Sequence, residues 1–175
     1  MSYQFKREPL LPEVANALCQ ACETAEEKLI IWTLLDTGLR VGELVSLTKD
    51  NILWQEKAIR ISGKGGPYGK LTKKRVVPLS DRVFKLFANY FAEHNKWFIG
   101  KSMAQKIVKK IANRAQITKP VCAHILRHTF ACIALQKGIS TGALQKVLGH
   151  DKLSTTQIYL NLTDTHLFEE FQRKW

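Results

Sequence analysis

His124-Ile125-Leu126-Arg127-His128-Thr129-Phe130-Ala131 is the stretch of sequence that decides the fold. Its apolar residues recur at helical spacing, which predicts a helix from about 123 to 137 that stops at Gly138. Spacings of three and four residues place His124, Arg127 and His128 on one face of that helix. The stretch therefore predicts a helix with a cationic face.

Two positions further along are tied to this helix by their spacing. In Leu148-Gly149-His150, the histidine follows Arg127 by 23 residues. Tyr159 follows His150 by nine residues, after the run Ser154-Thr155-Thr156. The chain thus carries an arginine, a histidine and a tyrosine at separations of 23 and nine residues.

Two earlier stretches add charged groups of the same kind. Thr37-Gly38-Leu39-Arg40-Val41-Gly42-Glu43-Leu44 places an arginine directly after a predicted helix stop, and Ser62-Gly63-Lys64-Gly65-Gly66 is closed by Arg75-Val76-Val77-Pro78-Leu79. Guanidinium is planar and always charged, and it forks onto phosphate oxygens. Arg40 and Arg127 could therefore stabilise a phosphorane without divalent ions. No cluster of Asp and Glu is evident in the sequence to hold such ions.

The remaining pattern is mainly helical, with a small sheet near the front. Helices are expected from about Leu11 to Ala21, Ala25 to Thr37 and Val41 to Leu47, and from caps at Ser80, Ser102 and Ser140. Met103, Ile107 and Ile111 are expected on the buried face of the Ser102 helix. Short strands are expected at Asn51–Trp54, Ala58–Ile61 and Arg75–Leu79, with Gly63–Lys74 as a long hairpin tip. Two more helices are expected at Ser154–Leu160 and Thr163–Arg173.

Charge is unevenly distributed along the 175 residues. The chain has 27 Lys and Arg against 15 Asp and Glu, a net charge of +12. Residues 57–119 hold 16 of the basic residues and only two acidic ones, which makes this block +14. A basic block in a nearly neutral frame is typical of a surface that binds a polyanion.

Composition excludes several other classes of protein. Hydrophobic residues make up 45% of the chain, which is globular composition. The longest apolar run is far too short to span a bilayer, and Lys6, Arg7 and Glu8 interrupt any signal peptide. Cys19 and Cys22 have metal-binding or redox spacing, but buried thiols are the default expectation and zinc the less favoured alternative.

In order and spacing, these four stretches resemble the catalytic domain of the tyrosine recombinases, the phage integrase family that includes Cre and the Xer recombinases. The resemblance runs from about Leu11 to the C-terminus. It implies a mainly α fold with a small three-stranded antiparallel β-sheet. It also implies a single catalytic domain over 1–175, without the N-terminal core-binding domain that most members carry, and a C-terminal tail helix over 163–175 that docks in cis or on a neighbouring subunit.

The resemblance also implies a role for each candidate. Tyr159 would attack the scissile phosphate, Arg40 and Arg127 would bind its oxygens, His124 would handle the proton of the nucleophile, and His150 would hydrogen-bond the phosphate. Lys64 would protonate the leaving oxygen, and Glu43 and His128 would support the site. Lys70, Lys73 and Lys74 remain alternatives for the acid, and Tyr68 for the nucleophile. The DNA contacts expected from the basic block are Lys70, Lys73, Lys74, Arg75, Lys106, Lys109, Lys110 and Arg114.

The implied function is site-specific cleavage and rejoining of double-stranded DNA through a 3′-phosphotyrosine, without metal, ATP or any other cofactor. Two alternatives stay open: a relaxing enzyme of the type IB topoisomerase kind, and a DNA-binding regulator that does no useful cleavage. The expected assembly is a tetramer on DNA and a monomer in free solution. The expected location is the cytoplasm, at the nucleoid, without contact with a membrane.

Overall fold

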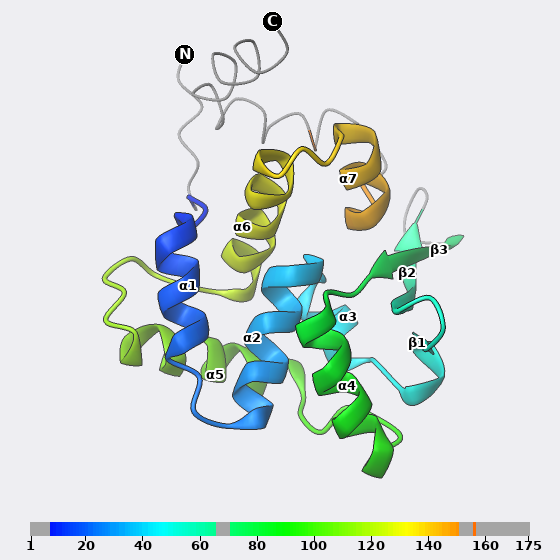
Figure 1. Ribbon diagram of the computed structural model, residues 1–175, viewed down its shortest axis with the longest axis horizontal. Helices are drawn as coiled ribbons and strands as arrows, with labels where there is room; N and C mark the ends of the chain where they lie inside the picture. The colour runs from blue at the N-terminus through cyan, green and yellow to red at the C-terminus, as the bar shows by residue number, and fades with distance from the viewer. Residues whose placement is uncertain (1–7, 66–70, 151–155, 157–175) are drawn as a thin grey trace, which may run out of the picture.

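A computed structural model describes residues 8–65, 71–150 and 156 of the chain, without the side chains of 63–65 and 71–73. These residues form helices packed around one long central helix, with a small sheet at one side (Figure 1). The helices are α1 (Pro12–Gln20), α2 (Ala25–Thr37), α3 (Val41–Val45), α4 (Asp81–Glu93), α5 (Lys101–Arg114), α6 (Ala123–Gln136) and α7 (Thr141–Leu148), and the strands are β1 (Ile52–Leu53), β2 (Ala58–Gly65) and β3 (Leu71–Pro78), with a 3-10 turn, η1 (Lys49–Asn51), before β1. The predicted fold class is confirmed.

Helix α2 is the centre of the main core. It contacts α1, α3, α4, α5 and α6, and Ile30, Ile31 and Leu34 are fully buried on it. A helix that is apolar almost all round must be covered on every side. Thr24 caps its start by accepting a hydrogen bond from the backbone N–H of Glu27 at 3.1 Å, and Gly38 ends it in the left-handed conformation at φ 62°.

The sheet is antiparallel in the order β1-β2-β3. Its long hairpin pairs Ile61 with Arg75 and continues to the pair Gly65 and Leu71. The prediction that Gly63–Lys74 is a loop was therefore wrong over 63–65 and 71–74. Glycine and lysine are poor strand signals, but once Ile59 and Val77 fix the register the backbone pairing extends outward from them.

The other helix starts follow the predictions in two cases out of three. Ser80 and Ser140 cap α4 and α7 by accepting hydrogen bonds from the backbone N–H groups of Val83 and Ala143. Ser102 is not a cap, because α5 begins at Lys101 and its N-cap position is Gly100. The buried face of α5 is also rotated from the one expected, since Met103 is 50% exposed and Ala104 is buried. The small side chain of alanine lets α5 pack closely at this position, but alanine gives only a weak hydrophobic signal in the sequence.

Helix α7 is joined to the rest of the described residues by a smaller core. This cluster consists of Ala131, Cys132 and Ala134 of α6 with Leu144 and Leu148 of α7. Helix α7 also contacts β3, and Figure 1 shows α7 beside the hairpin. Within the described residues no helix is long and apolar enough to cross a membrane.

Candidate active site

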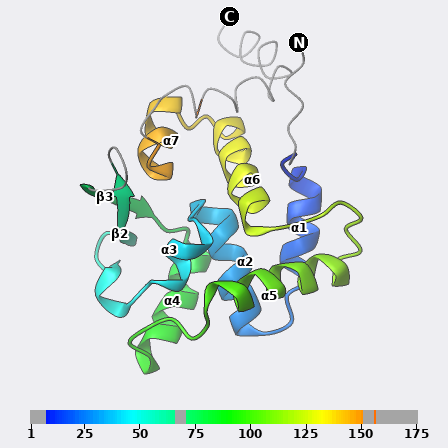
Figure 2. The ribbon, with the colours of Figure 1, turned by 180° about the vertical axis from the view of Figure 1, so that it is seen from behind.

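An open cleft of about 1300 Å³ lies between α3, α5 and the start of α6. Figure 2 views the ribbon from the side on which these elements are seen together. The lining is mainly polar and basic, and includes Arg40, Glu43, Ser62, Lys101, Gln105, Lys106, Lys109, His124 and Arg127. Three of the six predicted catalytic residues, Arg40, His124 and Arg127, therefore share one cleft, although 84 residues separate the first two along the chain.

Arg127 is held by the ends of two helices. The residue is buried, with only 3% of its surface exposed. Its Nη1 donates to the carbonyl of Gly38 at 2.6 Å and its Nη2 to the carbonyl of Leu148 at 2.7 Å. Both carbonyls lie at helix C-termini, where partial negative charge favours a cation. The guanidinium is thus fixed in place before any ligand binds.

Gly38 makes this arrangement possible. Its φ is +62°, and a Cβ at this position would lie 2.3 Å from Cδ1 of Phe130. Any other residue that ended α2 here would be strained at this φ and would have to displace the Phe130 ring of α6, the helix that carries Arg127. The glycine that signalled a helix stop in the sequence therefore also sets the distance between the two helices.

Arg40 lies at the first turn of α3, where Glu43 holds it. The backbone N–H of Arg40 donates to Oε2 of Glu43 at 2.8 Å, and its Nη1 lies 3.2 Å from Oε1. The Arg40 side chain is 52% exposed, whereas that of Glu43 is 11% exposed. Burial alone would raise the pKa of Glu43, but hydrogen bonds from Arg75 and from the backbone of Arg40 hold this pKa below its usual value. The geometry agrees with the supporting role expected for Glu43.

His150 follows Gly149, which ends α7 at φ 68°. Its Nδ1 lies 2.9 Å from Oγ1 of Thr156, and Thr156 is completely buried. Burial and, after it, the positive charges of Arg127 and Arg40 together lower the pKa of His150 to about 4. His150 is consequently neutral at pH 7 and lies within the electrostatic influence of both arginines.

The two histidines of α6 are in contact with each other. The rings of His124 and His128 meet edge to face, with centroids 4.3 Å apart. His124 is exposed to the cleft, while His128 is half-buried behind it. This placement agrees with a supporting position for His128.

Two predicted catalytic groups cannot be placed. Tyr159 lies outside the described residues, as do Tyr68, Lys70 and the predicted tail helix over 163–175. Lys64 is described as backbone only, on β2 opposite Thr72. Their roles remain predictions.

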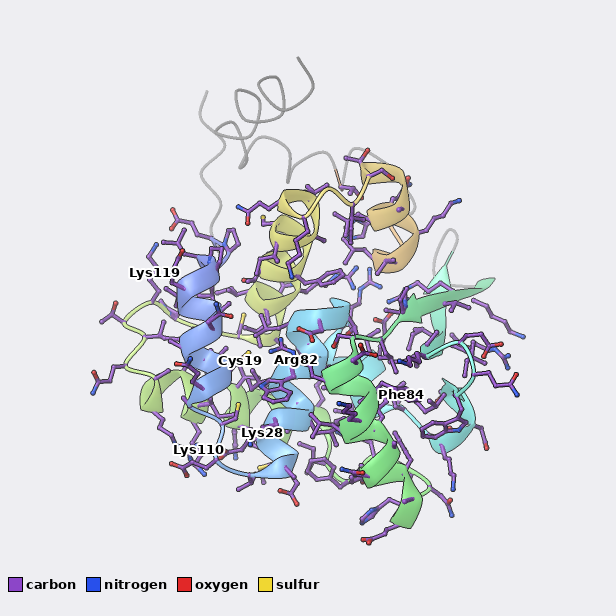
Figure 3. The ribbon with its side chains drawn as sticks, viewed as in Figure 1. Cys19, Lys28, Arg82, Phe84, Lys110 and Lys119 are labelled. Atoms are coloured by element: carbon purple, nitrogen blue, oxygen red, sulfur yellow. The ribbon has the colours of Figure 1, made fainter. Side chains whose placement is uncertain are left out.

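The expected DNA contacts fall into two groups. Lys106 and Lys109 line the cleft, and Lys74 is exposed on β3. By contrast, Lys110 lies 3.3 Å from Glu27, and Arg114 donates to Glu27 at 2.7 Å and to the carbonyl of Ala21 at 2.8 Å. Figure 3 shows Lys110 near the connection between α1 and α2, away from the hairpin. Lys110 and Arg114 are thus paired with a buried carboxylate that the sequence does not reveal, and their contact with DNA stays a prediction.

That carboxylate is strongly stabilised in its charged form. Hydrogen bonds from Arg114 above all, and from Lys110, hold the pKa of Glu27 at about 2 despite its burial. This cluster joins α5 to α2 and lies outside the cleft.

Arg75 also departs from the prediction. Its side chain is 8% exposed, and its guanidinium contacts Glu43 and the carbonyl of Val147. A group enclosed in this way does not face DNA. Strand alternation could have revealed this position, because residue 75 shares a face with the buried Val77.

Thr156 was noted in the sequence only as part of the run 154–156, and nothing in that pattern linked its hydroxyl to His150.

The cysteines are free thiols, and Cys19, Cys22 and Cys132 are buried. Burial raises the pKa of Cys22 to about 12 and that of Cys132 to about 11. Among the residues that the structure describes, no group of three or more His, Cys, Asp and Glu side chains is arranged to hold a metal ion.

Comparison with known proteins now shows the family. Residues 8–166 match the phage integrase family, and the chain belongs to it. It is 35% identical over 155 residues to the tyrosine recombinase XerA of Saccharolobus solfataricus, covering 86% of this chain and 51% of that protein. It is 31% identical over 175 residues to a tyrosine recombinase of Pseudothermotoga lettingae, covering 94% of this chain and 59% of that protein. The chain thus spans between half and three fifths of these two relatives.

Solved structures have the same architecture. A XerA recombinase superimposes with a TM-score of 0.80 at 28% identity, over 95% of this chain and 64% of that one. The catalytic domain of bacteriophage HP1 integrase superimposes with a TM-score of 0.73 over 95% of both chains, at 24% identity. The second likeness concerns the fold alone.

Proposed function

We propose that this chain cleaves and rejoins double-stranded DNA through a covalent 3′-phosphotyrosyl intermediate, as the catalytic part of a site-specific recombinase. The observation that carries the proposal is the convergence of Arg40, His124 and Arg127 on one cleft, with His150 close enough for both arginines to lower its pKa. A relative described as XerH bound to difH DNA in a post-cleavage complex has the same fold, with a TM-score of 0.76 at 24% identity.

The proposed step is an in-line displacement at phosphorus. The Oη of Tyr159 forms a bond to the phosphorus, the bond to the 5′ oxygen breaks, and the proton of Tyr159 passes to His124. Lys64 supplies a proton to the departing 5′ oxygen. Arg40 and Arg127 stabilise the charge that develops on the two non-bridging oxygens, which is the largest contribution available to a site of this kind. Reversal with another 5′ hydroxyl rejoins the strand without ATP.

The neutral state of His150 suits a hydrogen bond to the phosphate. With Nδ1 bonded to Thr156, the nitrogen that remains for the phosphate is Nε2. When the Thr156 hydroxyl donates to Nδ1, the proton of the neutral ring is on Nε2, where it can be donated to the phosphate. The completely buried Thr156 would thereby hold the orientation of the ring.

Covalent capture from a randomised substrate tests this function. The probe is a pool of duplexes with randomised arms and one nick near the centre, so that cleavage releases a short oligonucleotide and prevents rejoining. The proposal predicts SDS-stable adducts enriched in one sequence. Strand exchange between two copies of that sequence would indicate a recombinase, whereas relaxation of a supercoiled circle alone would indicate a topoisomerase. DNA binding without any adduct would indicate the remaining alternative, a DNA-binding regulator that does not cleave.

The cleft lysines should control the dependence of DNA binding on salt. Replacing Lys106 and Lys109 with glutamine is expected to reduce the slope of log K against log salt by about 2, since each phosphate contact contributes about 0.9. The matched control is Lys110→Gln on the same helix, which should change the slope far less because Lys110 lies against Glu27. Titrations at several salt concentrations measure the slopes. Equal slopes for the double variant and the wild type would show that α5 does not follow the DNA backbone.

Lys64 should matter only when the leaving oxygen needs a proton. Lys64→Ala is expected to slow cleavage of a normal duplex, and to have little effect when the 5′ oxygen is replaced by sulfur, which leaves without an acid. Single-turnover cleavage of the two substrates measures the difference. If the sulfur substrate fails to rescue Lys64→Ala but rescues Lys70→Ala or Lys73→Ala, one of those lysines is the acid instead.

The same proposal includes the assembly and its location. A tetramer would form on DNA, with a monomer in free solution, and the protein would act at the nucleoid in the cytoplasm. The DNA-bound tetramer follows from the chemistry of recombination, since exchanging two duplexes requires four cleavages.

A further inference from the structure

We propose that Arg75 is a positioning residue that locks Arg40 and His150 into one arrangement, so that Arg40 in the cleft and His150 near it act on the same phosphate. This inference rests on the proposed function. It replaces the expectation that Arg75 contacts DNA.

The guanidinium of Arg75 reaches two elements at once. Its Nη1 and Nη2 each donate to one carboxylate oxygen of Glu43 at 2.8 Å, and its Nε donates to the carbonyl of Val147 at 2.8 Å. The side chain is 8% exposed, and that of Glu43 is 11% exposed. A fork onto a largely desolvated carboxylate is geometrically specific as well as strong.

The Glu43 side of this contact leads to Arg40. Oε1 of Glu43 accepts from both Arg75 and the side chain of Arg40, and Oε2 accepts from both Arg75 and the backbone N–H of Arg40. Glu43 therefore cannot rotate to follow Arg40 without breaking its bonds with Arg75. The half-exposed Arg40 is anchored through a carboxylate that is itself held from behind.

The Val147 side leads to His150. Val147 is in the last turn of α7, where backbone carbonyls lack partners within the helix. The next carbonyl, that of Leu148, accepts from Arg127. A Cβ on Gly149 would lie 3.0 Å from Cδ of Arg75, so the arginine also lies closely against the residue before His150. Apart from contacts of this kind, α7 packs against α6 through a small apolar cluster. The hydrogen bond from Arg75 on β3 therefore contributes substantially to the position of α7 and of His150 after it.

Lysine could not make these contacts. Its single ammonium group lacks the planar fork, so it could reach either the carboxylate or the carbonyl of Val147 in good geometry, but not all three acceptors. Arg75 is also close to Lys64 along the hairpin, because it is paired with Ile61, three residues before Lys64 on β2. The same side chain thus connects the hairpin to Glu43 at the cleft and to the end of α7.

The experiment compares Arg75→Met, Arg75→Lys and a control, Arg60→Met, which removes the same charge from an exposed position on the neighbouring strand. Each protein is tested on the nicked duplex selected by the wild type, and both duplex affinity and single-turnover adduct formation are measured from pH 5 to pH 9. Arg75→Met is expected to slow adduct formation about 100-fold, the scale of a misplaced catalytic group. Its duplex affinity should stay close to that of Arg60→Met.

The pH profile separates positioning from mere stability. Without Arg75, burial raises the pKa of Glu43, so the carboxylate is protonated and releases Arg40 at a higher pH than in the wild type. Adduct formation by Arg75→Met should therefore decline at a higher pH as the solution is acidified. The double variant Glu43→Gln/Arg75→Met should lack this shift. Arg75→Lys keeps a positive charge that can reach Glu43, so it should show a smaller shift and a smaller loss. It is the variant that tests the inference if Arg75→Met does not fold.

Two results would overturn the inference. One is adduct formation at the wild-type rate in Arg75→Lys and in any folded Arg75→Met. The other is a loss of cleavage matched by an equal loss of affinity, without a shifted pH profile, which would make Arg75 a DNA contact. Failure of the proposed function looks different, because the wild type would then form no adduct.

Discussion

Tyr159→Phe is expected to abolish the covalent protein–DNA adduct while leaving duplex affinity nearly unchanged. The substitution removes one hydroxyl and no charge, so binding through Arg40, Arg127 and the cleft lysines stays intact. The free tyrosine hydroxyl has a pKa of about 10, and the cations of the cleft must stabilise its charge as it attacks. Denaturing gels with a labelled nicked duplex measure the adduct, and gel shifts measure the affinity.

Tyr68→Phe is the matched control for this prediction. It removes the same group from the other tyrosine that the sequence offers as a nucleophile, and the adduct should form as in the wild type. If the adduct persists in Tyr159→Phe and disappears in Tyr68→Phe, the nucleophile is Tyr68, between β2 and β3, and not Tyr159.

Arg127→Ala is expected to lower the rate of adduct formation by roughly 1000-fold, the effect of removing a preorganised donor to the developing oxyanion. The loss should be larger than for Arg40→Ala, because Arg127 is buried and held by the carbonyls of Gly38 and Leu148, whereas Arg40 is half exposed. Single-turnover cleavage at saturating protein measures the effect. Arg127→Lys should fail nearly as badly, since one ammonium group cannot span both carbonyls.

Stability must be controlled in this experiment. Leaving the two buried carbonyls without a donor costs about 1–3 kcal/mol each, so Arg127→Ala should also melt at a lower temperature. Cleavage is therefore measured well below the melting temperature of the variant, with Arg60→Ala as a charge-matched control from an exposed position. A folded Arg127→Ala protein that cleaves at the wild-type rate would remove Arg127 from the mechanism.

The helices could be predicted closely where local chemistry marks their ends. For α2, the apolar run and the stop at Gly38 predict the bounds that the structure shows, because a left-handed glycine acts locally. The extent of the β2–β3 hairpin could not be predicted in this way. Its outer pairs contain glycine and lysine, and they form only because the inner pairs set the register.

The site shows the same division. Arg40, His124, Arg127 and His150 could be chosen from spacing, and the structure brings the first three into one cleft with His150 nearby. Charge alone could not distinguish cations that face a ligand from cations that hold the protein together. Arg75 and Arg114 have carboxylate partners far away in sequence, Glu43 and Glu27, and only the packing of β3 and α5 brings each pair together.

In the proposed reaction, DNA is cleaved by transfer of its 3′-phosphoryl group to Tyr159. Mass spectrometry of the captured adduct after digestion with protease and nuclease identifies the linkage. We expect a nucleotide attached through its 3′ phosphate to the peptide that contains Tyr159, with a 5′ hydroxyl on the released strand. Attachment to another residue, or linkage through a 5′ phosphate, would contradict it.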